Sequence, residues 1–279
     1  MKKVMFLLAA TLVLVATGCN KENAVADDVQ YVSELKVNFE GDTRVSTSHS
    51  EAGLKFAWED GDNIEVWEDL NTSALRKIFT YDATTQTFKP SSNSDKLEIG
   101  KKYFAVNASN WYYIDATDGK SSIPMTLKGS TGVNNVPMIS NVFEATAENT
   151  MTTMHHIVGV VEIPVKASAN GKQLQRVGLN SQTANHALRG EFTITPEAPY
   201  TLTSTYGYFD NYNQTASDSP IDLSTSEVKS IFVPAFPGTY STIDIKYQLV
   251  GESEKNIETG HQLVVERGEI TKISVQTLN

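Results

Sequence analysis

Residues 31–40, with the sequence YVSELKVNFE, indicate the fold class of the chain. Four apolar side chains share one parity along this stretch: Tyr31, Leu35, Val37 and Phe39. Polar side chains occupy the other parity: Glu34, Lys36, Asn38 and Glu40. Successive side chains of a β-strand point to opposite faces, so this alternation predicts a strand with one buried face and one solvated face.

The same kind of pattern recurs along the rest of the chain. Gly, Asn, Asp, Ser and Pro separate further β-favouring runs: 54–58, 64–66, 77–81, 103–106, 111–114, 123–127, 157–165, 173–179, 190–194, 230–233, 242–249, 262–266 and 270–277. Asp60-Gly61 and Asn170-Gly171 are hairpin signals, because Gly accepts positive φ without steric cost. Pro164 predicts a bulge or a strand exit, and 206–219 is interpreted as a long loop.

Many short strands without a convincing helical pattern predict an all-β chain built from β-sandwiches. A polar seam at 145–153, with the sequence ATAENTMTT, separates two groups of predicted strands. We therefore expect an N-terminal sandwich over 29–148 and a C-terminal sandwich over 149–279, preceded by a processing signal (1–18) and a polar tether (19–28).

The first nineteen residues have the features of a bacterial lipoprotein signal. Lys2 and Lys3 precede an apolar run from Val4 to Ala16, which is too short for an ordinary membrane-spanning helix. Cys19 follows Ala16-Thr17-Gly18, as in a lipobox, so it is the expected attachment site for a lipid such as palmitate. The alternative is an ordinary secreted protein with an unpaired thiol. Cys19 is the only cysteine, so no disulfide can form within the chain.

The charge of the chain limits its partners. The formal net charge is −10, and removal of 1–18 takes away Lys2 and Lys3 but no acid, which lowers it to −12. Nucleic-acid binding needs a basic surface, so no nucleic-acid partner is expected. We expect membrane contact through lipid alone, at the outer membrane and cell surface.

Several short motifs, taken in order, carry a resemblance to a known family. They are FEGDTR (39–44), FAWEDGDNI (56–64), MHHI (154–157), VGL (177–179), LRG (188–190), VPA (233–235) and RGE (267–269). Together with the lipobox they resemble the fimbrillin family, the subunits and relatives of Bacteroidales surface pili. The resemblance implies two tandem transthyretin-like β-sandwiches and a structural role in a fimbria, with other fimbrial subunits as partners.

The resemblance also implies an assembly mechanism, protease-triggered donor-strand exchange. A trypsin-like protease cuts after a basic residue that follows the first strand, and the strand leaves with its lipid. A strand from a neighbouring subunit then fills the open groove. Here the candidate cleavage follows Arg44, and the displaced strand carries Tyr31, Leu35, Val37 and Phe39. Stalk, anchor and tip roles all remain open.

The C-terminal segment is the candidate donor strand. Ile273, Val275 and Thr277 alternate with polar residues there. An ordinary last strand of the C-terminal sandwich would show the same alternation, so both interpretations remain open.

Other chemistry finds little support in the sequence. Glu59, Asp60, Asp62 and Asn63 could ligate calcium, but the same residues favour tight turns. His155 and His156 are neighbours on a predicted strand and would point apart, so no metal and no cofactor are expected. No nucleophile elbow is present, so an enzyme is not expected.

The alternative function is a surface lipoprotein that binds glycans or another cell-surface ligand without polymerising. It depends on clustered aromatic residues: Trp111, Tyr112, Tyr113, Tyr206, Tyr208, Phe209 and Tyr212. Core filling is the competing explanation for these rings.

Overall fold

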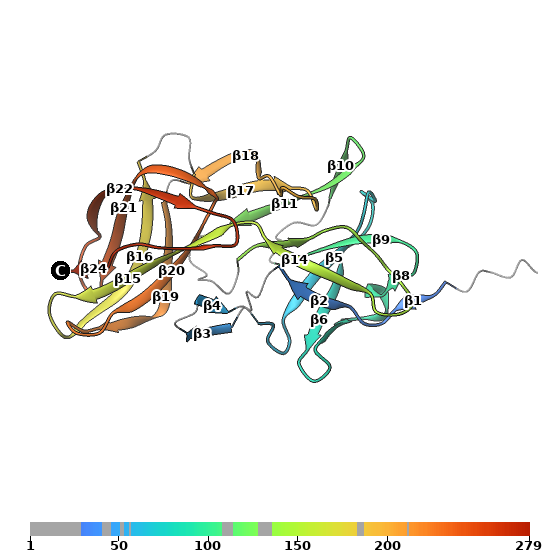
Figure 1. The fold of residues 1–279 in the computed structure, drawn as a ribbon, viewed down its shortest axis with the longest axis horizontal. Helices are drawn as coiled ribbons and strands as arrows, with labels where there is room; N and C mark the ends of the chain where they lie inside the picture. The colour runs from blue at the N-terminus through green and yellow to red at the C-terminus, as the bar shows by residue number, and fades with distance from the viewer. Residues whose placement is uncertain are drawn as a thin grey trace, which may run out of the picture.

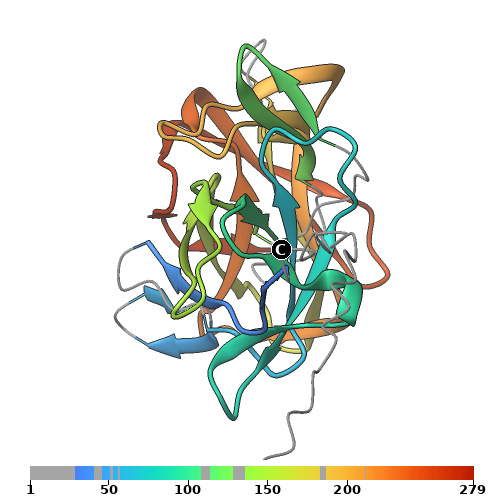
Figure 2. The same ribbon diagram turned by 90° about the vertical axis from the view of Figure 1, so that its right-hand side faces the viewer.

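The computed structural model describes residues 29–40, 46–50, 53–55, 57–107, 114–127, 136–182, 187–210 and 212–279. Its strands form two lobes along the long axis, and the last strands lie at the far end from the first ones (Figure 1). The two lobes overlap when the molecule is turned by 90° (Figure 2). The predicted all-β class is confirmed, with several sheets in a sandwich-like arrangement. Within the described residues, no helix has the length and apolar character to cross a bilayer.

One large sheet dominates the N-terminal lobe. Its order is β2 (Lys36–Phe39), β14 (Met151–His156), β12 (Met138–Ser140), β9 (Lys102–Val106), β5 (Asn63–Glu68), β6 (Lys77–Asp82) and β7 (Thr87–Pro90), with β13 (Phe143–Glu144) also on β9. Smaller pairings accompany it: β1 (Tyr31–Val32) with β8 (Leu97–Glu98), and β3 (Ser46–Ser50) with β4 (Gly53–Lys55). A short 3-10 turn, η1, spans Asn93–Asp95.

Two sheets face each other in the C-terminal lobe. The first contains β20 (Lys229–Ala235), β15 (Gly159–Ala167), β23 (Ile270–Lys272) and β24 (Gln276–Leu278). The second has the order β19 (Tyr212–Leu223), β16 (Lys172–Ser181), β21 (Gly238–Leu249) and β22 (Lys255–Val265). One core cluster, which includes Val161, Leu179 and Ile245, is built from both sheets. This is sandwich packing with the apolar faces turned inward.

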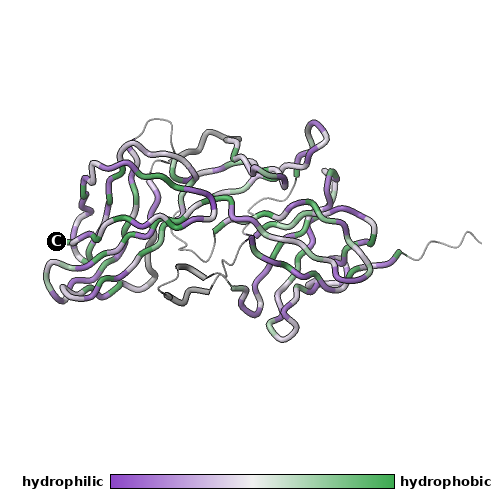
Figure 3. The backbone as a smooth tube through the Cα atoms, viewed as in Figure 1, coloured by the Kyte–Doolittle hydropathy of each residue, from purple (hydrophilic) through white to green (hydrophobic). Residues whose placement is uncertain are grey.

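A third sheet joins the two halves of the sequence. It has the order β10 (Asp115–Thr117), β11 (Lys120–Leu127), β17 (Arg189–Ile194) and β18 (Thr203–Asp210). A core cluster beneath it combines Phe104 and Met125 with Phe192 and Phe236. The separate N-terminal cluster contains Leu35, Phe79 and Phe88. Hydrophobic and hydrophilic residues alternate along many strands, as a layered β fold requires (Figure 3).

The strand pairing differs from two hairpin predictions. Asp60 and Gly61 do form a turn, but β5 beyond it pairs with β6 and β9, and β4 pairs with β3. The turn at Gly171 (φ +80) connects β15 to β16, which belong to opposite sheets. The Asp-Gly and Asn-Gly signals therefore identified turns correctly, but turn chemistry does not specify which strands pair.

The predicted loop at 206–219 is wrong. Most of it belongs to β18 and β19, and β19 pairs with β16 along most of its length. Each of these two strands lies at the edge of its own sheet.

Sheet membership does not change at the seam. β14 begins at Met151, after the predicted boundary at 148/149, yet it pairs with β12 and β2 of the N-terminal sheet. β15, which starts at Gly159, is the first strand of the C-terminal sandwich. The division into two domains stays a prediction, with the sheets changing near 157–158.

Candidate functional site

Two of the predicted site residues lie outside the described residues. These are the lipidation candidate Cys19 and the cleavage candidate Arg44, and the signal and tether lie outside as well. The site can therefore be built from the two chain segments that the mechanism would exchange. We call residues 29–40 the first-strand segment and residues 270–279 the C-terminal segment.

The first-strand segment fills part of the N-terminal core. Leu35 is 0% exposed and Val32 is 6% exposed, while Val37 and Phe39 are partly buried against the same cluster. Tyr31, which the alternation placed on the buried face, is 54% exposed, so that prediction is wrong. The strand is interrupted between Val32 and Leu35, and this interruption shifts the buried parity from odd to even residues in β1.

Backbone hydrogen bonds hold this segment on both sides. On one side β2 runs parallel to β14, with Glu40 N donating to Met154 O at 2.9 Å. On the other side Leu35 and Phe88 of β7 exchange two hydrogen bonds, of 2.9 and 2.8 Å. Since β14 and β7 are near opposite ends of the sheet order, the first-strand segment closes the sheet on itself.

An aromatic stack covers the end of the segment. The rings of Phe39 and Trp58 stack with centroids 4.9 Å apart, and Trp58 meets Phe88 edge-on, also at 4.9 Å. The sequence placed Trp58 in a hairpin strand, but it precedes the turn at Asp60 without belonging to a strand. Its ring instead links the first strand to β7, which periodicity alone could not reveal.

A polar cluster at the end of β2 joins distant parts of the chain. We define the Glu40 cluster as Glu40, His155, Tyr200 and Arg267. Glu40 Oε2 lies 3.0 Å from Arg267 Nη1 and 2.9 Å from His155 Nδ1. Tyr200 stacks on His155 with centroids 4.8 Å apart, and the Arg267 guanidinium lies 4.9 Å from the centre of the Tyr200 ring. Glu40, His155 and Arg267 all come from sequence motifs named above, although no pattern predicted that they would meet.

The environment of this cluster changes the pKa values of Glu40, of the neighbouring His156 and of Tyr200, whose pKa is raised by burial. Burial raises the pKa of Glu40, but the contacts with His155 and Arg267 outweigh burial and hold it below its ordinary value. Burial lowers the pKa of His156 to about 4; the negative charge of Glu40 opposes this shift, and the positive charge of Arg267 adds to it. His156 is therefore neutral at pH 7, while Glu40 is ionised.

The C-terminal segment lies in its own sandwich. Both β23 and β24 run parallel to β15. Ile273 packs against the core, whereas Val275 is 48% exposed and Thr277 is also exposed. The alternation therefore does not continue, and Gln276 and Leu278 take the buried positions.

Pro164 of β15 explains this interruption. Val160 N donates to Glu269 O and Glu162 O accepts from Ile273 N, so even-numbered residues of β15 present their backbone to the C-terminal segment. Pro164 is next in this series and has no N–H. The prediction that Pro164 bends or ends its own strand is wrong, since β15 continues in register with β20 to Val165. The break occurs in the partner strand, between Lys272 and Gln276.

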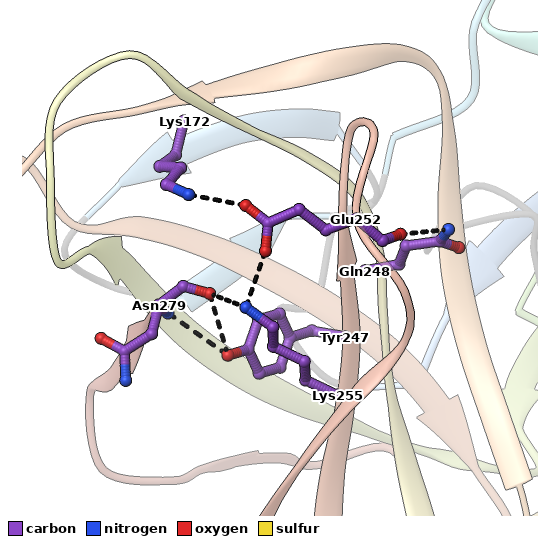
Figure 4. A network of polar contacts seen from close by, with 6 residues as sticks. All are labelled: Lys172, Tyr247, Gln248, Glu252, Lys255 and Asn279. Carbon is purple, nitrogen blue, oxygen red and sulfur yellow. Dashed lines mark hydrogen bonds and ion pairs between the residues drawn. The ribbon is translucent and has the colours of Figure 1, made fainter.

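A cavity borders the middle of the C-terminal segment, and a polar network holds its end. The cavity has a volume of about 400 Å³, and Ile243, Leu263 and Ile273 contribute to its lining. In the network, Lys255 Nζ donates to Asn279 O and to Glu252 Oε2, both at 2.6 Å, and Lys172 contacts the same carboxylate (Figure 4). The segment is thus fastened at its end and loosely packed in its middle.

The acidic cluster has a structural role, whereas of the aromatic residues only the side chain of Tyr212 is described. Asp62 Oδ2 accepts from Glu59 N at 2.7 Å and Asp60 Oδ1 from Ala83 N at 3.0 Å, as turn chemistry requires. Residues 111–113 lie outside the described part. Tyr212 is partly buried, with Lys246 Nζ 5.1 Å from its ring centre.

Comparisons with known proteins bear on the fold. No family model and no curated protein matches the chain. A solved structure of a proposed cell adhesion protein from Bacteroides ovatus is similar, with TM-score 0.56 and 14% identity over 89% of this chain and 92% of that one. A second such protein, from Bacteroides uniformis, has TM-score 0.47 and 13% identity over 88% and 93%. A fimbrial protein from Bacteroides ovatus has TM-score 0.35 and 12% identity over 88% and 50%. The first comparison shows a shared fold. The TM-scores of the other two are below 0.5, so these two similarities carry no weight.

Proposed function

We propose that this chain is an adhesive or structural subunit of a surface fimbria, exported as a lipoprotein on Cys19 and assembled by donor-strand exchange. The observation that carries the proposal is the two-sided pairing of the first-strand segment with β14 and with Phe88 of β7. Its removal would leave two unpaired strand edges and an opening where Leu35 was buried. The cell adhesion description of the similar Bacteroides ovatus structure with TM-score 0.56 supports this class of function.

The positions of the two segments also support assembly in a head-to-tail filament. β1 and the end of the C-terminal segment lie at opposite ends of the molecule, while β2 lies nearer its middle (Figure 1). A donor at one end and an acceptor groove at the other form a heterologous contact, which repeats without closing. A chain of such contacts grows as a fibre.

The first test is cleavage. Purified protein is incubated with an Arg-specific protease, and the products are separated on a denaturing gel without heating. The wild-type chain should give a ladder of multimers after release of the segment that ends at Arg44. Arg44→Ala should stay monomeric, and a ladder of equal strength from this variant would refute cleavage at Arg44 as the trigger.

The second test is the identity of the donor. Val275 is 48% exposed, so Val275→Asp should leave the monomer folded. If the C-terminal segment inserts into a neighbour's groove, the added charge would have to be buried there, and the ladder should disappear. Val228→Asp is the matched control, since Val228 is 44% exposed outside both segments. Equal polymerisation of both variants would assign the donor role to another part of the chain.

A further inference from the structure

Arg267 links the two segments that the proposed function would exchange. It lies in the turn between β22 and β23, directly before the C-terminal segment begins. Its Nη1 donates to His156 O at 2.9 Å and contacts Glu40 Oε2 at 3.0 Å, across 227 positions of sequence. One guanidinium therefore contacts the end of the first strand and the end of β14.

We propose that the Glu40–Arg267 contact couples the two segments, so that loss of the first strand loosens the start of the C-terminal segment. Arg267 and Glu40 are then positioning residues: they keep the candidate donor in place until the acceptor groove is open. The biological meaning of this coupling rests on the proposed function, but the coupling itself is a property of the intact monomer.

The turn that carries Arg267 fits tightly against β15, so a movement there is passed on to β23. Gly268 N donates to Val158 O and Val160 N donates to Glu269 O, both at 3.0 Å. At Gly159 a Cβ would lie 2.3 Å from Glu266 O, which leaves no room for a side chain. Because backbone atoms contact backbone atoms here, the turn cannot shift alone, and β23 must follow it.

The other two residues of the Glu40 cluster, His155 and Tyr200, surround the contact between Glu40 and Arg267. Tyr200 lies between Arg267 and His155, and His155 contacts the same carboxylate oxygen as Arg267. When Glu40 departs with the first strand, these two side chains lose their shared anion. Coupling of this kind is reciprocal, so a disturbance of Arg267 must also weaken the hold on β2.

Hydrogen–deuterium exchange on uncut protein tests the proposal. The background is Arg44→Ala, which removes the candidate cleavage site. Glu40→Gln should increase exchange at 270–273 by about three- to fivefold, the size expected for a partly exposed charge pair. Arg267→Gln should increase exchange at 36–40 by a similar factor. The double variant should exchange little faster than either single variant, because all three variants break the same contact.

Glu197→Gln is the matched control. It breaks the exposed Lys120–Glu197 pair of 2.6 Å, which involves neither segment, so exchange at 36–40 and 270–273 should not change. The coupling is refuted if Glu40→Gln affects 36–40 alone, or if the two single effects simply add. Such a result would leave cleavage and polymerisation standing. Conversely, a failure to polymerise would not alter the exchange data.

Discussion

The first-strand segment and the C-terminal segment have one feature in common. β2 runs parallel to β14, and β23 and β24 run parallel to β15, whereas every other strand pair in the described part of the chain is antiparallel. Parallel pairs are slightly less stable per residue. Both segments are therefore held by the less stable kind of strand pairing.

The two segments differ in what they complete. The first-strand segment is bonded on two sides and buries Leu35 and Val32, so it closes a sheet and its core. The C-terminal segment is bonded along β15, is interrupted beside Pro164 and lies next to a cavity. Removal of the first segment would therefore open a sheet on two sides, whereas the second segment is held along one strand, with an interruption beside Pro164.

The largest expected effect concerns the core contribution of the first strand. Leu35→Ala removes a side chain that is 0% exposed and should lower the free energy of unfolding by about 2–5 kcal/mol. Val275→Ala in the C-terminal segment should change it by less than about 0.5 kcal/mol. Chemical denaturation measures both, and similar values would contradict the different burial of these two positions.

The free energy of unfolding should depend on pH through His156, the last residue of β14, which pairs with β2. Its pKa is about 4 in the folded protein against an ordinary value of 6.5. Below pH 6.5 the unfolded chain binds a proton at this site and the native protein does not. The free energy of unfolding should therefore fall by up to roughly 3 kcal/mol between pH 6.5 and pH 4.

Denaturation at both pH values in wild type and in His156→Gln checks this prediction. The variant should lose most of that difference, and an unchanged difference would contradict the assignment to His156. Glu40 adds a smaller loss at low pH, because its pKa is lowered and its contribution disappears as the carboxylate is protonated.

The turn before the C-terminal segment can be disturbed from the β15 side. In Gly159→Ala the new Cβ would meet Glu266 O and the Val265 side chain, so the turn must move. We expect a loss of about 1–3 kcal/mol in the free energy of unfolding. Exchange should increase in both 36–40 and 270–273, because Arg267 moves with the turn. Gly119→Ala strains a turn between β10 and β11 (φ +73), remote from both segments, so exchange in both segments should not change.

The smallest effect should come from the polar network at the chain end. Lys255→Gln removes the contacts with Asn279 O and Glu252 (Figure 4). Exchange at 276–279 should increase slightly, while 36–40 stays as in wild type. An equal increase in both segments would mean that they communicate through the chain end and not through Arg267.

The sequence predicted the strands well and their partners poorly. Alternation located β6, β9, β11 and β16, because it depends only on which face of a strand is buried. The two-sided pairing of Leu35 and Lys36 depends on sheet order, which periodicity does not contain. The Glu40 cluster was equally hidden, since Glu40 and Arg267 look like ordinary surface charges until the fold brings them together.

The most direct test of the account is the N-terminal residue of this protein in assembled surface fibres, determined by sequencing or mass spectrometry. If the first-strand segment is discarded after cleavage at Arg44, the chain in the fibre should begin at Val45. An acylated Cys19 at the start of the polymerised chain would contradict the account, because the first strand would then still occupy its groove.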